Sequence, residues 1–393
     1  MSFTTDTRSP ALDGIRGLAI LMVLAHNTLR VAPEGGVLSE VVASVSGIGW
    51  TGVTLFFVLS GFLITRGLME EQGSPTYFRA FYLRRALRIF PLYYLFLVFF
   101  LLVLPALDAA PQNIVDDLPR QIWYWLYLSN WTQFADLGGT GLPHLWSLAV
   151  EEQFYLLWPL LVWRRSPRQV LWLCMGVIAV AFVARVGLVL GGVEPMQIYT
   201  FTITRVDSLA VGGVAAVWVH QGGAAPRLAR EPGWLIGVAV AALVLGRLIP
   251  GGYGMVDPVG QTVGYLLFGI AFAALVLAAQ VADTGRGPWW IRGLRLAPLR
   301  SLGRYSYAMY LFHVPIDSMV VVPTLRSMGH ELPLPLPEAL AVAAVTGLLT
   351  WAAAWLSYHL SEKWFLGLKG RVAPRWKPPL AQPVAAGGSR LAP

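Results

Sequence analysis

The stretch with the clearest capacity for chemistry runs from Leu12 to Arg30 and carries a histidine inside an apolar segment. Asp13 and Arg16 lie at one end of this stretch, and His26 lies in its opposite half. On a helix that rises about 1.5 Å per residue, Arg16 and His26 lie about 15 Å apart. An ionisable side chain in a membrane span usually faces a protein interior or a wet cavity, and histidine is suited to proton transfer near neutral pH. The alternative is a histidine at headgroup level without a function, so the interpretation depends on the rest of the chain.

Composition identifies the class of protein. Of the 393 residues, 56% are apolar and 13% are charged, whereas a soluble domain has about 25% charged residues. The net charge of +8 comes from short basic clusters between apolar segments, which is typical of membrane topology rather than of nucleic-acid binding. The single cysteine, Cys174, excludes a disulfide framework and a cysteine-based metal site. We therefore expect a multi-pass protein of the cytoplasmic membrane that has no cleavable signal peptide and binds neither nucleic acid nor a metal.

Ten apolar segments near the length of a membrane span predict an all-α fold of about ten transmembrane helices. They cover roughly residues 11–29, 48–69, 89–107, 145–163, 170–190, 199–219, 233–250, 259–280, 301–322 and 338–360. Of the 29 Lys and Arg residues, 23 fall in alternate loops or their flanks, and only three fall in the intervening loops. This asymmetry predicts that both termini are cytoplasmic. Residues 1–369 are expected to form the membrane domain and residues 370–393 a basic, disordered cytoplasmic tail.

Two aromatic segments predict helices that lie at the membrane surface. Within the long external loop 108–143, residues 121–131 are too short to span and suit the outer interface. Residues 74–88 alternate aromatic side chains with arginines, as in a helix at the inner interface. Glycines of the second span, including Gly49, Gly52 and Gly61, are interpreted as sites of close helix packing.

The span over 145–163 places polar side chains at the outer half of the membrane. Offsets of three and four residues align on one helical face, which here presents His144, Ser147, Glu151 and Tyr155. Glu152 points about 100° away from that face. Two adjacent carboxylates in a span are hard to explain by packing, so function is the favoured interpretation.

Arg205 and Asp207 enter at a similar outer depth in the span over 199–219. A structural ion pair between them is nearly as good an explanation as a functional role. Together with His26 and the two glutamates, they predict an active-site layer on three helices. His313 and His359, in the last two spans, are interpreted as packed and hydrogen-bonded residues.

A cluster of arginines occupies the inner side, at Arg79, Arg84, Arg85 and Arg88. Retention of positive charge in the cytoplasm accounts for some of them. Arginines at a membrane mouth can also hold a phosphorylated cofactor through bidentate contacts.

These stretches resemble the motifs of acyltransferase family 3, membrane proteins that transfer acyl groups to hydroxyl groups of sugars and other acceptors. The matching stretches are residues 12–26, 52–62, 83–91, 144–159, 205–209, 302–313 and 361–363, so the resemblance runs through nearly the whole chain. Two positions depart from the family pattern. Arg16 and His26 are one residue closer than usual, and Thr54 stands where the family often has an acidic residue.

The resemblance implies an O-acyltransferase that moves an acyl group from cytoplasmic acyl-CoA to a hydroxyl of a sugar-containing or lipid-linked acceptor. The expected acyl group is acetyl. The resemblance also makes His26 the general base and Glu151 its orienting partner. Arg205 or a backbone amide is expected to stabilise the oxyanion, and Asp207 is expected to be a catalytic residue beside it. The residues expected to bind acyl-CoA are Arg16, Arg84, Arg85 and Arg88, and those expected to bind the acceptor are His144, Ser147, Glu152 and Tyr155. The main alternative is a proton-coupled transporter that uses the same residues as a relay, although no inverted repeat is visible.

Overall fold

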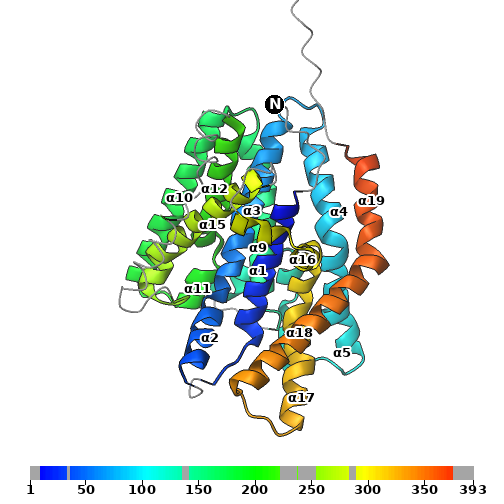
Figure 1. The fold of residues 1–393 in the computed structure, drawn as a ribbon. Coiled ribbons are helices and arrows are strands. Elements are labelled where there is room, and N and C mark those ends of the chain that lie inside the picture. Colours follow the sequence, from blue (N-terminus) through cyan, green and yellow to red (C-terminus); the bar gives the residue numbers. More distant parts are fainter. Residues whose placement is uncertain are drawn as a thin grey trace, which may run out of the picture.

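Long helices packed side by side account for most of the computed structural model (Figure 1), which describes residues 9–32, 36–134, 141–221, 237, 254–282 and 289–374. The long helices are α1 (Pro10–Thr28), α3 (Thr51–Glu70), α4 (Tyr77–Val98), α9 (Leu145–Val162), α10 (Pro167–Leu190), α12 (Thr202–Gln221), α15 (Tyr265–Ala282), α16 (Ala297–Pro315) and α18 (Leu336–Ser357). The 10-residue α19 (Lys363–Val372) continues α18 after a π-helical turn. No strand occurs in these described ranges, where Val31 and Leu334 form an isolated β-bridge. The predicted all-α fold is confirmed.

Shorter helices fill the connections between the long ones. They are α2 (Val37–Gly47), α5 (Leu104–Ala106), α6 (Gln112–Asp117), α7 (Ile122–Trp125), α8 (Ser129–Phe134), α11 (Pro195–Thr200) and α17 (Val322–Ser327). Four π-helical turns extend long helices, at Phe99–Val103, Gly260–Gly264, Ile316–Val321 and Tyr358–Glu362. The predicted tail begins inside α19, and residues 375–393 lie outside the described part of the chain.

Seven helical segments of the described chain are long and apolar enough to cross a membrane. The helices α1 and α9, 19 and 18 residues long, are not among the seven, because each carries ionisable residues in an otherwise apolar sequence. Nine of the ten predicted segments coincide with helices, whereas 233–250, which contains Arg247, lies outside the described residues apart from Gly237. The chain is thus a multi-pass membrane protein, and the count of ten spans stays a prediction.

The predicted helix at the inner interface is wrong, because residues 77–98 form the single helix α4. Tyr77, Phe81 and Ile89 are all buried, so the apolar face that contacts the core continues through the arginine-rich part. The predicted outer helix over 121–131 is also interrupted. Tyr127 adopts a φ of 54° between α7 and α8, and its ring stacks on Tyr93 with centroids 4.1 Å apart.

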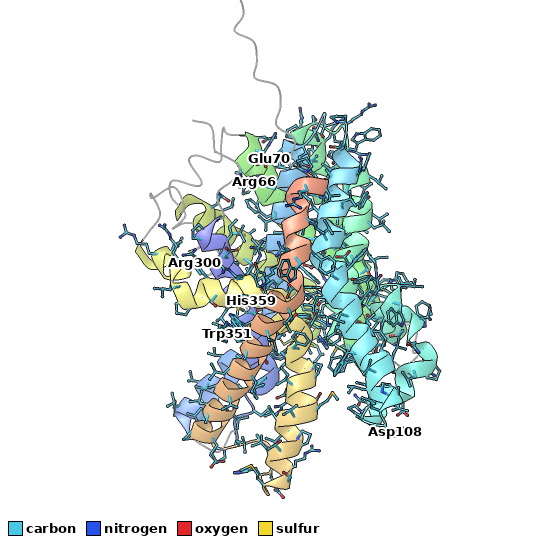
Figure 2. The ribbon with its side chains drawn as sticks, turned by 90° about the vertical axis from the view of Figure 1, so that its right-hand side faces the viewer. Arg66, Glu70, Asp108, Arg300, Trp351 and His359 are labelled. Carbon is cyan, nitrogen blue, oxygen red and sulfur yellow. The ribbon has the colours of Figure 1, made fainter. Side chains whose placement is uncertain are left out.

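The two ends of the bundle are distinguished in Figure 2. Arg66 and Glu70, in the last turns of α3, lie at one end, and Asp108, which follows α5, lies at the opposite end. We refer to these as the Glu70 end and the Asp108 end. Because α1 finishes beside the start of α3, its last turn, which holds His26, lies toward the Asp108 end (Figure 1).

Helix α1 lies in the middle of the bundle between α3 and α16 (Figure 1). Its start is fixed by Ser9, whose hydroxyl accepts a hydrogen bond from the Leu12 amide, and by Pro10 at the first helical position. Close approach on both sides depends on glycines. A Cβ on Gly303 of α16 would lie 1.8 Å from the Asp13 carbonyl oxygen, and one on Gly49 would lie 2.3 Å from that of Met22.

Substituting the glycines between α3 and α12 is expected to destabilise the bundle. A Cβ on Gly61 would lie 1.9 Å from the Leu209 carbonyl oxygen, and one on Gly212 would lie 2.0 Å from that of Val58. Because backbone cannot yield as a side chain does, Gly61→Ala or Gly212→Ala should cost about 1–3 kcal/mol. Thermal unfolding in detergent measures this, with Gly176→Ala of α10 as the control, because no atom lies within 4 Å of a Cβ there. Equal melting temperatures for Gly212→Ala and the control would contradict the packing described.

Candidate active site

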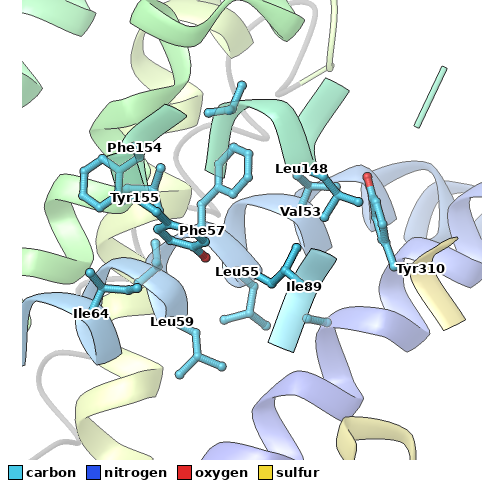
Figure 3. Close-up of a cluster of buried hydrophobic side chains, with 14 of the residues drawn as sticks. Val53, Leu55, Phe57, Leu59, Ile64, Ile89, Leu148, Phe154, Tyr155 and Tyr310 are labelled. Atoms are coloured by element: carbon cyan, nitrogen blue, oxygen red, sulfur yellow. The ribbon is translucent and has the colours of Figure 1, made fainter. Parts of the chain in front are cut away.

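Side chains from α1, α3, α4, α9 and α16 enclose a cavity of about 110 Å³. We call it the arginine cavity, because three arginines line it. Its charged lining residues are Arg16, Arg85, Arg88, Glu151 and Glu152, and its hydroxyl groups include those of Ser60, Ser147, Tyr155 and Tyr310. Figure 3 shows part of its apolar wall, including Val53, Phe57, Ile89 and Leu148.

The arginines of α4 lie well inside the bundle. Arg85 and Arg88 are eight and eleven residues beyond Tyr77, or about 12 and 17 Å along the helix. The Arg85 guanidinium lies over the Tyr155 ring, 5.3 Å from its centroid. Arg16 pairs with Asp13 at 2.7 Å, whereas Arg88 has no ion pair or hydrogen bond within the described part of the chain. The cavity therefore contains two guanidinium groups, those of Arg85 and Arg88, that make no hydrogen bond to the described residues, and it also contains the carboxyl groups of Glu151 and Glu152.

Arg84 differs from its neighbours on α4. Its guanidinium pairs with Glu71 and donates a hydrogen bond to the Ala373 carbonyl oxygen at 3.4 Å. Arg84 does not line the arginine cavity. Three of the four arginines predicted to bind a phosphorylated cofactor thus share one cavity, and Arg84 lies outside it.

The polar face predicted for α9 contributes directly to the arginine cavity. Ser147, Glu151 and Tyr155 line it, and the Glu151 carboxyl group lies near the hydroxyls of Tyr155 and Ser60, which hydrogen-bond each other. Arg85 and Arg88 are the cations that act on this carboxyl group. The prediction that Glu152 points away is wrong, because Glu152 lines the same cavity.

A second cavity, of about 250 Å³, shares two lining residues with the first. We call it the histidine cavity, because His26, His144 and His313 all line it. Three aromatic residues, Trp50, Trp146 and Tyr199, form part of its wall, with the Trp146 and Tyr199 ring centroids 4.7 Å apart. Among the described residues, no Lys, Arg, Asp or Glu lines this cavity.

The group that orients His26 is a backbone carbonyl. His26 Nδ1 lies 3.3 Å from the Ser46 carbonyl oxygen, and a carbonyl can only accept a hydrogen bond. The hydrogen therefore sits on Nδ1, which leaves the lone pair of Nε2 free to accept a proton. Glu151 has other partners and lines the other cavity, so the predicted pairing of Glu151 with His26 is corrected.

Val53 and Tyr310 line both cavities. The Tyr310 hydroxyl donates to the His144 carbonyl oxygen at 3.0 Å and lies 2.6 Å from the Ser147 hydroxyl. These bonds fix the Tyr310 side chain, which forms part of the wall of both cavities. No sequence pattern marks Tyr310 itself as functional, although it lies within the stretch 302–313 that resembles a family motif.

Arg205 and Asp207 do not line either cavity. Asp207 pairs with Arg185 at 2.7 Å, so the alternative of an Arg205–Asp207 ion pair is wrong. Arg205 is fully buried and donates to the Thr54 hydroxyl at 3.0 Å. Four rings surround its guanidinium, with centroid distances of 4.4 Å for Tyr265, 5.0 Å for Tyr199 and 5.8 Å for both Phe57 and Trp146.

The rings that Arg205 contacts belong to the walls of both cavities. Phe57 lines the arginine cavity, while Trp146 and Tyr199 line the histidine cavity. Its Nε and Nη1 have no hydrogen-bond partner among the described residues. The observed contacts therefore place Arg205 behind the walls of both cavities rather than inside either one.

Comparison with known proteins places these residues in a family. A family model described as an acyltransferase domain matches residues 9–358. The peptidoglycan O-acetyltransferase OatA of Listeria monocytogenes is 28% identical over 326 residues, which are 79% of this chain and 49% of that protein. The O-acetyltransferase OatA of Staphylococcus aureus is 28% identical over 377 residues, or 90% of this chain and 56% of that protein.

The chain spans about half the length of these curated relatives. No solved structure matches it. The family model nevertheless covers all the helices that line the two cavities, from α1 to α16. The chain therefore belongs to the acyltransferase family 3 that its motifs resemble.

Proposed function

We propose that this protein transfers an acetyl group from acyl-CoA to a hydroxyl group of a glycan, across the boundary between the two cavities. The observation that carries the proposal is that an arginine-lined cavity and a histidine-lined cavity share Val53 and Tyr310. The relatives named as O-acetyltransferases support acetyl as the acyl group, and one of them is named for peptidoglycan. We therefore take a cell-wall glycan as the acceptor.

The arginine cavity is the proposed donor site. Guanidinium groups bind phosphate oxygens through charge-assisted, often bidentate, hydrogen bonds. Arg88, which has no partner among the described residues, and Arg85, which contacts Tyr155 only through its ring, are free to make such bonds. Glu151 keeps a positioning role, because it lies near Arg85, Arg88 and the hydrogen-bonded hydroxyls of Tyr155 and Ser60.

His26 is the proposed general base on the acceptor side. Its Nε2 takes the proton of the acceptor hydroxyl as that oxygen attacks the thioester carbonyl carbon. The carbon–sulfur bond then breaks, and the leaving thiolate recovers the proton from His26. The Ser46 carbonyl holds the imidazole in the required tautomer throughout. Arg205 acts as a positioning residue, because it holds rings that line both cavities.

Purified protein in proteoliposomes tests this function. Acetyl-CoA labelled in the acetyl group is supplied with soluble peptidoglycan fragments, and the products are identified by mass spectrometry. We expect an acetyl ester on a sugar hydroxyl. Transfer from another donor, or label that enters no glycan, would contradict the proposal.

The membrane orientation is a separate prediction. Because 23 of the 29 Lys and Arg residues lie on alternate loops and flanks, we expect both termini and the Glu70 end to be cytoplasmic. In a Cys174→Ser background, an impermeant thiol reagent applied to intact cells should label a cysteine at Gln112 but not one at Arg371. Labelling of position 371 from outside would overturn the topology.

A further inference from the structure

The three histidines of the histidine cavity are all anchored in the same way. His313 Nδ1 lies 2.7 Å from the Tyr310 carbonyl oxygen, and His144 Nε2 lies 3.1 Å from that of Leu311. With His26 on the Ser46 carbonyl, each imidazole uses one ring nitrogen as a donor to the backbone. A neutral imidazole that donates at one nitrogen accepts at the other, so each ring keeps one acceptor lone pair.

The surroundings of His144 and His313 favour the neutral form. Both are buried, at 6% and 1% exposure, and no acidic side chain among the described residues lines their cavity. Asp317, the carboxylate that acts on His313, is bound by Arg30 through two hydrogen bonds. A buried cation without its own partner would be costly.

An acceptor nitrogen in this cavity is left without a donor. His144 Nδ1 is buried and has no hydrogen-bond partner among the described residues. A buried polar atom of this kind costs free energy unless a ligand or a water donates to it. Since His144 lines the cavity, a hydroxyl of a bound ligand is positioned to do so.

We infer that His144 and His313 bind the acceptor by receiving hydrogen bonds from hydroxyl groups of a neutral sugar unit. The aromatic wall of Trp50, Trp146 and Tyr199 suits the apolar face of a sugar ring. The absence of charged lining residues among those described disfavours a carboxylate or ammonium group within the cavity. The inference rests on the proposed function, since it assigns the acceptor to the cavity that holds His26.

Two substitutions remove the acceptor nitrogens but retain the anchors. His313→Asn keeps an amide N–H at the position of Nδ1 and loses Nε2, and His144→Gln keeps an amide N–H at the position of Nε2 and loses Nδ1. The matched control is His359→Asn, because His359 Nδ1 also bonds a backbone carbonyl, that of Trp355 at 2.8 Å, but lines neither cavity.

The experiment measures binding as well as transfer. The dissociation constant of a neutral tetrasaccharide of N-acetylglucosamine is obtained by calorimetry, and the KM for soluble peptidoglycan fragments and for acetyl-CoA from acetyl transfer. We expect each cavity variant to weaken tetrasaccharide binding and raise the KM for the fragments by about 3–10-fold, the loss of one hydrogen bond. The KM for acetyl-CoA and the melting temperature should not change, and His359→Asn should match the unmodified protein.

Failure of the inference differs from failure of the proposed function. Unchanged tetrasaccharide binding in both cavity variants, or no binding by the unmodified protein, overturns the inference whether or not acetyl transfer occurs. Binding that the variants weaken, in a protein that transfers no acetyl group, supports the sugar site and overturns the proposed reaction instead.

Discussion

His26→Ala is expected to lower kcat by about 10²–10⁴-fold, the usual contribution of general-base catalysis. The imidazole is anchored at Nδ1 by the Ser46 carbonyl, so only Nε2 is available to take the proton of the acceptor hydroxyl. Binding of acetyl-CoA should persist, because the arginine cavity lacks His26 among its lining residues. Initial rates of acetyl transfer in proteoliposomes, together with equilibrium binding of acetyl-CoA, measure both effects.

His359→Ala is the control for this substitution, since that side chain lines neither cavity. Both variants should retain the melting temperature of the unmodified protein within a few degrees. A folded His26→Ala protein with normal turnover would remove the general base from the mechanism.

Arg88→Ala is expected to raise the KM for acetyl-CoA by about 10–100-fold and to change kcat little. A hydrogen bond to a charged group contributes about 1.5–3 kcal/mol of binding free energy, which corresponds to this increase in KM. Loss of a phosphate contact that is equally strong in the ground state and the transition state raises KM and leaves kcat unchanged. Arg84→Ala is the matched control one helical turn away, because Arg84 is already paired with Glu71. Its KM for acetyl-CoA should stay within about threefold of the unmodified value.

Steady-state kinetics at varied acetyl-CoA distinguish the two arginines. Equal increases in KM for Arg84→Ala and Arg88→Ala would show that acetyl-CoA binding depends on the total positive charge of α4 and not on a specific contact with Arg88. A fall in kcat at unchanged KM for Arg88→Ala would place this arginine in transition-state stabilisation instead.

The spans could be predicted from the sequence because the membrane imposes a minimum length on every apolar segment. The errors arose where tertiary packing decides the outcome. The arginine-rich residues 77–88 are not a separate surface helix, because Tyr77 and Phe81 are buried on the face that α4 turns to the core. The turn at Tyr127 was not apparent, because a positive φ in a tyrosine has no sequence signal.

The site was predicted in part, because helical periodicity fixes which residues of one helix share a face. Periodicity placed Ser147, Glu151 and Tyr155 together, and all three line the arginine cavity. It does not give the depth at which neighbouring helices meet: Glu151 lines the cavity that contains Arg16, which is ten residues from His26 along α1. The actual partner, the Ser46 carbonyl, is a backbone atom, which sequence does not distinguish.

The sidedness of the two substrates tests the central claim most directly. In proteoliposomes whose protein orientation is established by labelling at position 112, acetyl-CoA is supplied on one side of the membrane and glycan on the other. We predict acetylated glycan only when acetyl-CoA is on the side of the Glu70 end and glycan on the side of the Asp108 end. Product that forms only in the reverse arrangement, or only with both substrates on one side, would contradict transfer between the two cavities.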